Sequence, residues 1–265
     1  MKTLLILGCS YSHLGYHKQY SKKENSYTIH LMKKLGANKL INLAMSGASP
    51  STVNRILLQY LDNPVFGYPD FVFIQWPNAS RNEYFIDEKY DHDDSEYITT
   101  SINQGLIHFE TGPNEGLPEL TIGNNTWTST QWDGTITMPR GDDKRFRSAH
   151  ETLFINESQR LINLYKEVGI AENYLGNLRI PYAYVESDYF DGQGILSQDH
   201  YDMPAYNYAQ HLCHKQYFIP GMGIQKNSPT YAGANDDYAD GHPGPQSHKN
   251  FADVLIPKLK EIINS

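Results

Sequence analysis

The amino-acid sequence predicts a three-layer α/β/α domain with a mostly parallel sheet. Near-continuous apolar runs at residues 4–7 and 70–76 are typical of strands that are buried on both faces. Between them, residues 25–36 and 49–61 carry apolar side chains at helical spacing. Strands that alternate with helices in this way favour a parallel sheet covered by helices. With 265 residues, of which 39% are hydrophobic, we expect a single domain over residues 1–265.

The remaining elements follow the same alternation. Gly36 ends the first helix, and Ser49 or Ser51 provides an N-cap for the second. An irregular, tyrosine-rich region is expected at 187–240, with one helix around 205–215. The other expected elements are strands at 39–45 and 180–185 and helices at 148–168 and 246–263.

Residues 84–147 interrupt this alternation. They are rich in Asp, Asn, Gly and Thr and contain short β-prone pieces at 106–109, 120–122 and 135–138. We therefore expect an inserted subdomain of hairpins and loops after the third strand. An insertion there would overhang the edge of the sheet at which α/β proteins bind ligands.

The composition narrows the classes of function. A net charge of −8 carries no basic footprint, so nucleic acid is not expected as a partner. The apolar runs are shorter than the ~20 residues of a membrane-spanning helix, and residues 4–7 are too short for a signal-peptide core. No membrane partner and a cytoplasmic location are therefore expected. Cys9 and Cys213 are too few for a disulfide framework. The 20 tyrosines favour a sugar-binding or interface surface, or equally a tyrosine-rich core.

Three short segments carry side chains suited to chemistry, each at a predicted strand end or before the last helix. Ser10, in a Gly-Cys-Ser sequence after the first strand, can present its hydroxyl while nearby backbone N–H groups face an anion. Gly47 follows the second strand and offers its amide to a closely approaching ligand. Asp240 and His242 precede the last helix, where the carboxylate can orient the imidazole. Taken singly, each segment is better explained as an ordinary turn or loop.

Together, the order and placement of the three segments resemble the SGNH (GDSL-like) hydrolase family, outside the insertion. The resemblance implies a flavodoxin-like sheet and hydrolysis of acyl esters without a metal or cofactor. It implies that Ser10 is the nucleophile, that His242 is the general base and then the acid, and that Asp240 orients the imidazole. The backbone amides of Ser10 and Gly47 would line the oxyanion hole.

The sequence departs from the family pattern at three places. Cys9 replaces the family's Asp between Gly and Ser, a position without a catalytic role. Asp240 lies two residues before the histidine instead of three, which leaves Asp237 as an alternative orienting residue. The family's Gly-x-Asn after the third strand is absent. Asn78 lies one position late as the third oxyanion donor, and Gln75 is the alternative.

Other aromatic and basic side chains are candidates for contact with substrate. We expect Tyr11, Trp76 and Arg81 to line the pocket, although Trp76 fits the core equally well. Trp127 and Trp132 in the insertion are suited to stacking on sugar rings.

The histidines beyond His242 are assigned simpler roles. His13 and His17 are expected in a surface loop near Ser10, and His248 is expected to have a structural role in the first turn of the last helix. The set His211, Cys213 and His214 lacks a second ligand pair at zinc spacing, so no metal site is predicted.

The sequence thus predicts a serine esterase or acetylesterase that acts on an ester of a small molecule or glycan. One alternative is a protein of this fold that has lost catalysis and binds a glycan or a protein. Another is an acyltransferase that uses the same residues. The sequence leaves the oligomeric state open.

Overall fold

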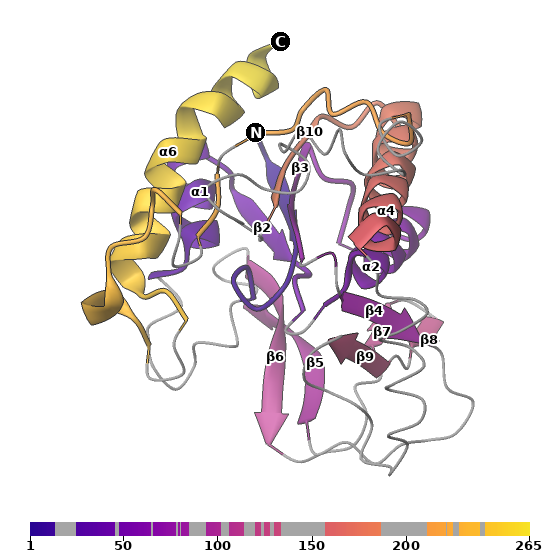
Figure 1. Cartoon of the computed structure of the whole chain (residues 1–265), viewed down its shortest axis with the longest axis horizontal. Coiled ribbons are helices and arrows are strands. Elements are labelled where there is room, and N and C mark those ends of the chain that lie inside the picture. Colours follow the sequence, from indigo (N-terminus) through magenta and orange to yellow (C-terminus); the bar gives the residue numbers. More distant parts are fainter. Residues whose placement is uncertain are drawn as a thin grey trace.

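A six-stranded sheet forms the centre of the molecule, in the order β10-β3-β1-β2-β6-β5 (Figure 1). Its strands are β1 (Thr3–Leu7), β2 (Lys39–Asn42), β3 (Phe71–Trp76), β5 (Asp94–Ser101), β6 (Leu106–Pro113) and β10 (Tyr182–Glu186). All neighbours pair in parallel except β5, which is antiparallel to β6. The computed structural model describes residues 1–13, 25–45, 48–64, 66–77, 79, 81–84, 94–101, 106–113, 120–122, 125–127, 130–133, 157–186, 211–220, 222–224, 228–238 and 242–265.

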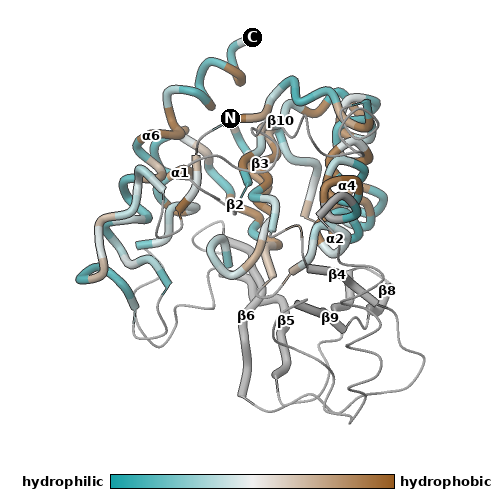
Figure 2. The backbone as a smooth tube through the Cα atoms, viewed as in Figure 1, coloured by the Kyte–Doolittle hydropathy of each residue, from teal (hydrophilic) through white to brown (hydrophobic). Residues whose placement is uncertain are grey.

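Four helices in the described part of the chain cover the two faces of the sheet and confirm the predicted three-layer α/β/α arrangement. Helices α1 (Tyr27–Leu35) and α6 (Pro245–Asn264) pack together on one face, and α2 (Pro50–Asp62) and α4 (Glu157–Asn177) pack together on the other (Figure 1). In Figure 2 hydrophobic residues, in brown, are prominent near β3 and recur among hydrophilic ones along the helices.

Two apolar layers result from the alternation of side chains along each strand. Leu5, Leu7 and Ile74 belong to the cluster under α2 and α4. Leu4 and Phe73 belong to the cluster under α1 and α6. Because a strand places neighbouring side chains on opposite faces, a run that is apolar throughout buries both faces at once.

The helix ends are set by local hydrogen bonds. Gly36 closes α1 in the left-handed conformation, with φ of 68°, as the sequence predicted. Ser49 caps α2 in a reciprocal capping box with Thr52. Ser49, rather than Ser51, is therefore the N-cap.

The order in which successive strands join the sheet reverses at β1. The chain leaves β1, passes through α1 and returns as β2 on one side, whereas β3 pairs with the other side of β1. In open α/β sheets, ligands bind outside the carboxyl ends of the strands at such a switch point. Ser10 follows β1 and therefore lies at this position.

Two strands of the region 84–147 extend the main sheet. β6 pairs in parallel with β2, and β5 forms the edge. Two smaller antiparallel pairs follow, β4 (Arg81–Tyr84) with β9 (Thr130–Asp133) and β7 (Leu120–Ile122) with β8 (Asn125–Trp127). The β-prone pieces at 106–109 and 120–122 are confirmed as strands, and 135–138 lies outside the described residues.

Helix α4 differs from its predicted bounds. Its described part begins at Glu157 and runs past Gly169 to Asn177, whereas the prediction stopped at Val168. Gly169 marks a close contact instead of a helix end, because a Cβ there would lie 1.7 Å from the backbone oxygen of Leu212. The helix expected around 205–215 is wrong for its described part, since residues 211–215 form a turn, a bend and irregular backbone.

Among the helices that the structure describes, none is both long enough and apolar enough to cross a membrane.

Two glycines of α4 provide a matched test of this packing. We expect Gly169→Ala to lower the free energy of unfolding by about 1–3 kcal/mol, because the new methyl group forces the 211–213 segment away from the helix. Gly176→Ala should raise it by about 0.5 kcal/mol, because nothing lies within 4 Å of the added Cβ and alanine favours the helix.

Urea denaturation of both variants measures these changes against the wild type. Stabilisation by Gly169→Ala similar to that by Gly176→Ala would show that the segment at Leu212 does not constrain the helix.

Candidate active site

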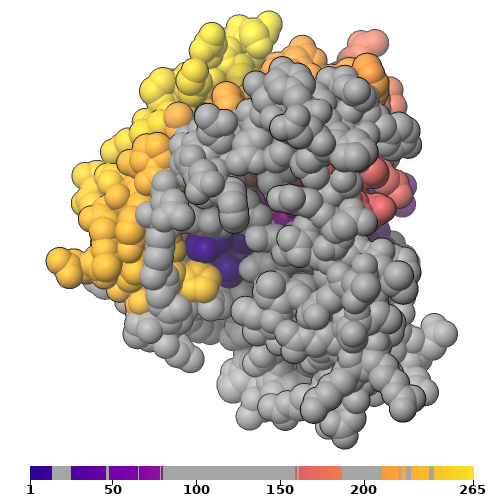
Figure 3. Space-filling model, in the orientation of Figure 1, coloured from indigo at the N-terminus to yellow at the C-terminus, as the bar shows by residue number. Residues whose placement is uncertain are grey.

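Ser10 and His242 meet at the carboxyl end of the sheet. The Ser10 Oγ lies 3.1 Å from the His242 Nε2, although 232 residues separate them in the chain. Ser10 is 5% exposed, and His242 is half-buried. In Figure 3 the N-terminal segment, in indigo, and the C-terminal part, in yellow, are exposed together on this face of the molecule. A segment near the start of the sequence and one near its end therefore form one site, in which an imidazole nitrogen lies within hydrogen-bond distance of a serine hydroxyl.

Tyr11 lies beside the imidazole. The ring centroids of Tyr11 and His242 are 5.2 Å apart, with an angle of 49° between the ring planes. Tyr11 is half-buried and packs against both apolar layers. Its ring therefore limits the rotation of His242 on one side.

The turn that carries Ser10 is held by backbone hydrogen bonds. The N–H groups of Ser12 and His13 both donate to the Cys9 carbonyl, at 2.9 and 3.1 Å. Asn42, at the end of β2, donates from Nδ2 to the Ser12 carbonyl at 2.8 Å and accepts from the Ala44 N–H at 3.0 Å. Asn42 thereby links the Ser10 turn to the segment that leads from β2 toward Gly47.

Buried polar side chains lie under this turn. Ser12 donates from its hydroxyl to Gln75 Oε1, and Tyr27 lies 2.5 Å from the same hydroxyl. All three residues are fully buried. Burial raises the pKa of Tyr27 well above its ordinary value, so the phenol stays neutral. Neither Ser12 nor Tyr27 was predicted from the sequence as part of the site, and Gln75 was predicted only as an alternative oxyanion donor.

The loop that carries His242 is fixed to the start of α6. The Tyr238 N–H donates to the His242 carbonyl at 2.8 Å and closes the loop. The Asp236 carboxylate accepts from the backbone N–H groups of Gln246 and Ser247, at 2.9 and 2.7 Å. Gly244 is the N-cap residue and has no side chain to accept these bonds, so the Asp236 carboxylate caps the first N–H groups of the helix from eight residues earlier.

Gly244 is required for this contact. A Cβ at Gly244 would lie 1.5 Å from the Asp236 backbone oxygen. Any side chain at this position would therefore separate the capping residue from the helix.

The other candidate residues fall into two groups. Gly47, Asn78, Asp240 and His17 lie outside the described residues, as do the side chains of Arg81, Trp127 and Trp132. Asp237 lies near Tyr231, whose pKa is raised by desolvation and by a hydrogen bond to Asp237. Trp76 is fully buried in the cluster under α2 and α4.

The predictions for the neighbouring histidines have different outcomes. His248 is confirmed as a structural residue of the first turn of α6, because its Nδ1 accepts from the Tyr27 N–H at 3.2 Å and its ring stacks on Tyr27. His13 is fully buried, so the expectation of a surface position was wrong. The hydrogen bond from the His13 N–H to the Cys9 carbonyl turns this part of the chain toward the interior.

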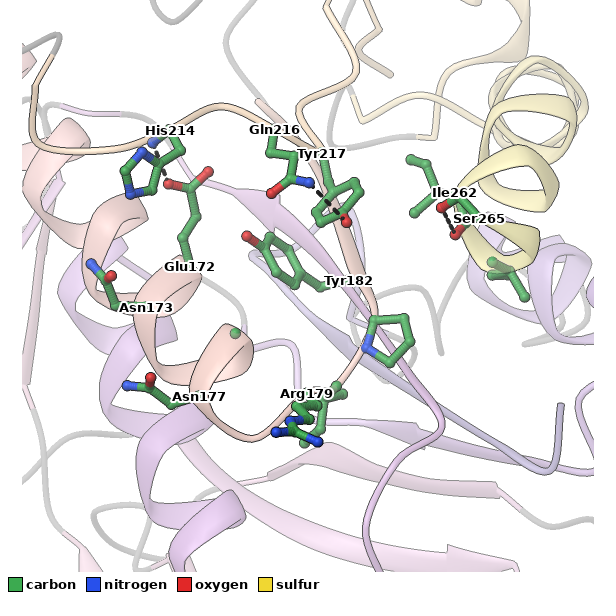
Figure 4. A pocket seen from close by; sticks show the side chains of 14 residues that line it. Glu172, Asn173, Asn177, Arg179, Tyr182, His214, Gln216, Tyr217, Ile262 and Ser265 are labelled. Carbon is green, nitrogen blue, oxygen red and sulfur yellow. Dashed lines mark hydrogen bonds between the residues drawn. The ribbon is translucent and has the colours of Figure 1, made fainter.

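A cavity of about 460 Å³ lies at the opposite end of the molecule from this site (Figure 4). It is bounded by the end of α4, the start of β10 and the last residues of α6, including Arg179, Tyr182 and Ser265. The 20 residues of α6 span about 30 Å, so the cavity lies far from His242.

Glu172 organises the residues around the cavity. Its carboxylate accepts from the Tyr184 hydroxyl at 2.7 Å and from the His214 N–H at 2.5 Å, and it is 4% exposed. Glu172 thus fixes the 213–217 segment to α4. In the part of the chain that the structure describes, no three His, Cys, Asp or Glu side chains are grouped as metal ligands.

Comparisons with known proteins identify the fold. No family model and no curated protein matches the chain. Among solved structures, the esterase EstA from Pseudoalteromonas sp., inhibited by monoethylphosphonate, matches at 12% identity with a TM-score of 0.50, over 100% of both chains. TesA matches at 12% identity with a TM-score of 0.46, over 98% of this chain and 99% of TesA. A carbohydrate esterase matches at 12% identity with a TM-score of 0.47, over 98% of this chain and 68% of its own. The likeness to EstA establishes a shared three-layer α/β/α fold.

Removal of the Asp236 carboxylate tests the anchoring of the His242 loop. We expect Asp236→Ala to lower the free energy of unfolding by about 1–2 kcal/mol, because two N–H groups of α6 lose their acceptor. Glu261→Ala, at an exposed position near the other end of α6, is the control and should change it by less than about 0.5 kcal/mol. Equal effects of the two substitutions in urea denaturation would contradict the capping role.

The Cys213 thiol gives a pH test of the cluster around Glu172. Burial, and then the Glu172 carboxylate, raise the pKa of Cys213 from 9.0 to about 12. The unfolded chain releases this proton near pH 9, whereas the folded chain keeps it. The contribution to stability is therefore complete below pH 9 and is lost as the pH rises from 9 to 12.

Urea denaturation at pH 8 and pH 10 measures this effect. The wild type should lose more stability between the two pH values than Cys213→Ala, whose loss of packing is the same at both. An equal loss in the two proteins would show that the thiol does not titrate abnormally.

Proposed function

We propose that this chain is a serine esterase of the SGNH type, which hydrolyses an acyl ester of a small alcohol or of a sugar. Ser10 is the nucleophile, and His242 is the general base and then the general acid. The observation that carries the proposal is the 3.1 Å contact between the Ser10 Oγ and the His242 Nε2. The shared fold with EstA, an esterase, supports the same class of reaction.

The geometry supports a specific proton path. A serine hydroxyl is a weak nucleophile and needs a base within hydrogen-bond reach. When Ser10 donates its proton to Nε2, the neutral imidazole of His242 carries its own proton on Nδ1. As Oγ attacks the ester carbonyl carbon, Nε2 takes the hydroxyl proton. The imidazolium then returns this proton to the departing alkoxide, and a water molecule hydrolyses the acyl-enzyme by the same path in reverse.

Asp240 is our candidate for the acceptor of the Nδ1 proton. A carboxylate at that nitrogen fixes the tautomer that leaves Nε2 free to accept, and it stabilises the imidazolium. Asp237 stays the alternative, because a carboxylate has two oxygens and can accept from Tyr231 and from an imidazole at the same time.

We assign the oxyanion hole to the amides of Ser10 and Gly47, with Asn78 as the third donor. Gln75 stays the alternative: its oxygen accepts from Ser12, whereas its buried amide nitrogen has no acceptor among the described residues. Loss of one oxyanion donor typically lowers the rate by about 10²–10³-fold.

Tyr11 is our candidate for a wall of the substrate site. It lies next to His242 and keeps part of its ring exposed. Arg81 remains a candidate through its position in β4, just after β3. Trp76, which is fully buried, would act by supporting this wall from the core.

Covalent labelling of Ser10 tests the proposal. A fluorophosphonate probe should label the wild type and should not label Ser10→Ala. His242→Gln should slow labelling and the hydrolysis of p-nitrophenyl acetate by about 10³-fold or more, because the hydroxyl loses its base. His214→Gln, at an exposed position, is the matched control and should react at the wild-type rate.

A folded wild-type protein that neither reacts with the probe nor hydrolyses the ester would overturn the proposal. Binding of acetylated glycans without turnover would then favour a protein that has lost catalysis. Transfer of the acetyl group to an added sugar, faster than to water, would identify an acyltransferase.

A further inference from the structure

A chain of hydrogen bonds under the Ser10 turn runs in one direction. Gln75 Oε1 can only accept, so the single hydroxyl proton of Ser12 is donated to it. The bond of 2.5 Å between Ser12 Oγ and the Tyr27 hydroxyl must therefore be donated by Tyr27. The chain runs from Tyr27 through Ser12 to Gln75, and it requires a neutral phenol.

The three residues come from three different parts of the fold. Tyr27 begins α1, Ser12 belongs to the turn after β1, and Gln75 lies in β3. The carbonyl of Ser12 is held separately by Asn42 at 2.8 Å. Both the side chain and the backbone of Ser12 are thus fixed, two residues after the proposed nucleophile.

Tyr27 also contacts α6, the helix that follows the His242 loop. Its N–H donates to His248 Nδ1 at 3.2 Å, and its ring packs edge-on against Phe251, with centroids 4.9 Å apart. His248 and Phe251 both belong to α6. One residue therefore contacts both the turn that carries Ser10 and the helix to which the His242 loop is anchored.

We propose that Tyr27, Ser12 and Gln75 act together as positioning residues that set the separation between Ser10 and His242. This inference rests on the proposed function. None of the three touches the substrate, because each is fully buried. Removal of any one of them lets the Ser10 turn move relative to α6, and proton transfer from Oγ to Nε2 becomes less efficient.

The proposal distinguishes a coupled unit from three independent core residues. A chain in which each hydroxyl orients the next is broken by the loss of any one member. The second substitution within the chain should therefore add little to the first, whereas independent residues have additive effects.

The experiment is a double-mutant cycle on the full chain. Tyr27→Phe, Ser12→Ala and Gln75→Met should each lower kcat for p-nitrophenyl acetate and the rate of fluorophosphonate labelling by about tenfold, with KM unchanged. Ser12→Ala combined with Gln75→Met should be no slower than the slower single variant. Tyr60→Phe is the matched control, because it removes a buried tyrosine hydroxyl that bonds Gly67 at 2.6 Å, and kcat should not change.

A second measurement reports on position without catalysis. In protein labelled with ¹⁵N-histidine, the His242 Nε2 resonance, assigned through His242→Gln, should shift in Ser10→Ala. It should shift in the same direction in Tyr27→Phe and Ser12→Ala, and it should stay unchanged in Tyr60→Phe.

Several results would overturn the inference. Additive losses, or a lower melting temperature with unchanged kcat and an unchanged Nε2 resonance, would show that the three residues act only in the core. A loss in Gln75→Met alone, with normal Ser12→Ala, would instead indicate a direct contact of Gln75 with the oxyanion. A wild-type protein that is inactive but shows the expected resonance shifts would overturn the proposed function and leave the positioning role intact.

Discussion

The position of Ser10 depends on residue 8 being a glycine, which has no side chain. A Cβ there would lie 2.6 Å from the Ser12 hydroxyl and 3.0 Å from the Gln75 carbonyl oxygen. β1 and β3 remain paired up to Leu7 and Ile74, so their ends are still close together at the next residue. Only glycine allows the Ser12 hydroxyl to approach Gln75 across this gap. A larger residue would push the turn, and Ser10 with it, away from β3.

The histidine side of the site is fixed by a similar restriction. Asp236 caps α6 from outside the helix, and the bare backbone of Gly244 lets it do so. Ser10 lies in the turn just after the central strand β1, and His242 lies in the loop just before the long helix α6. Each member of the pair is therefore attached to a rigid element. Placement on rigid elements explains how a contact between residues 232 positions apart can be held at 3.1 Å.

The sequence predicted what depends on local periodicity and on the common edge of parallel strands. Ser10 and His242 could be paired because their order and placement, after the first strand and before the last helix, resemble the pattern of the SGNH hydrolase family. Capping by Asp236 could not be predicted, because it acts across a loop that no local pattern describes. β6 was missed as part of the main sheet because its partner β2 is distant in sequence. The special role of Gln75 was detectable in the sequence, since it is a polar residue within an otherwise apolar strand.

The two ends of the sheet show why chemistry is expected at only one of them. Apolar strands exclude polar side chains from the middle of the sheet, so these side chains are concentrated at its two ends. At the cavity end, Glu172 accepts from Tyr184 and His214, and these bonds hold a loop in place. At the other end, the bonds of Ser12, Asn42 and Asp236 hold the surrounding backbone instead. Ser10 and His242 are thus left within hydrogen-bond distance of each other, and the proposed acyl transfer depends on this contact.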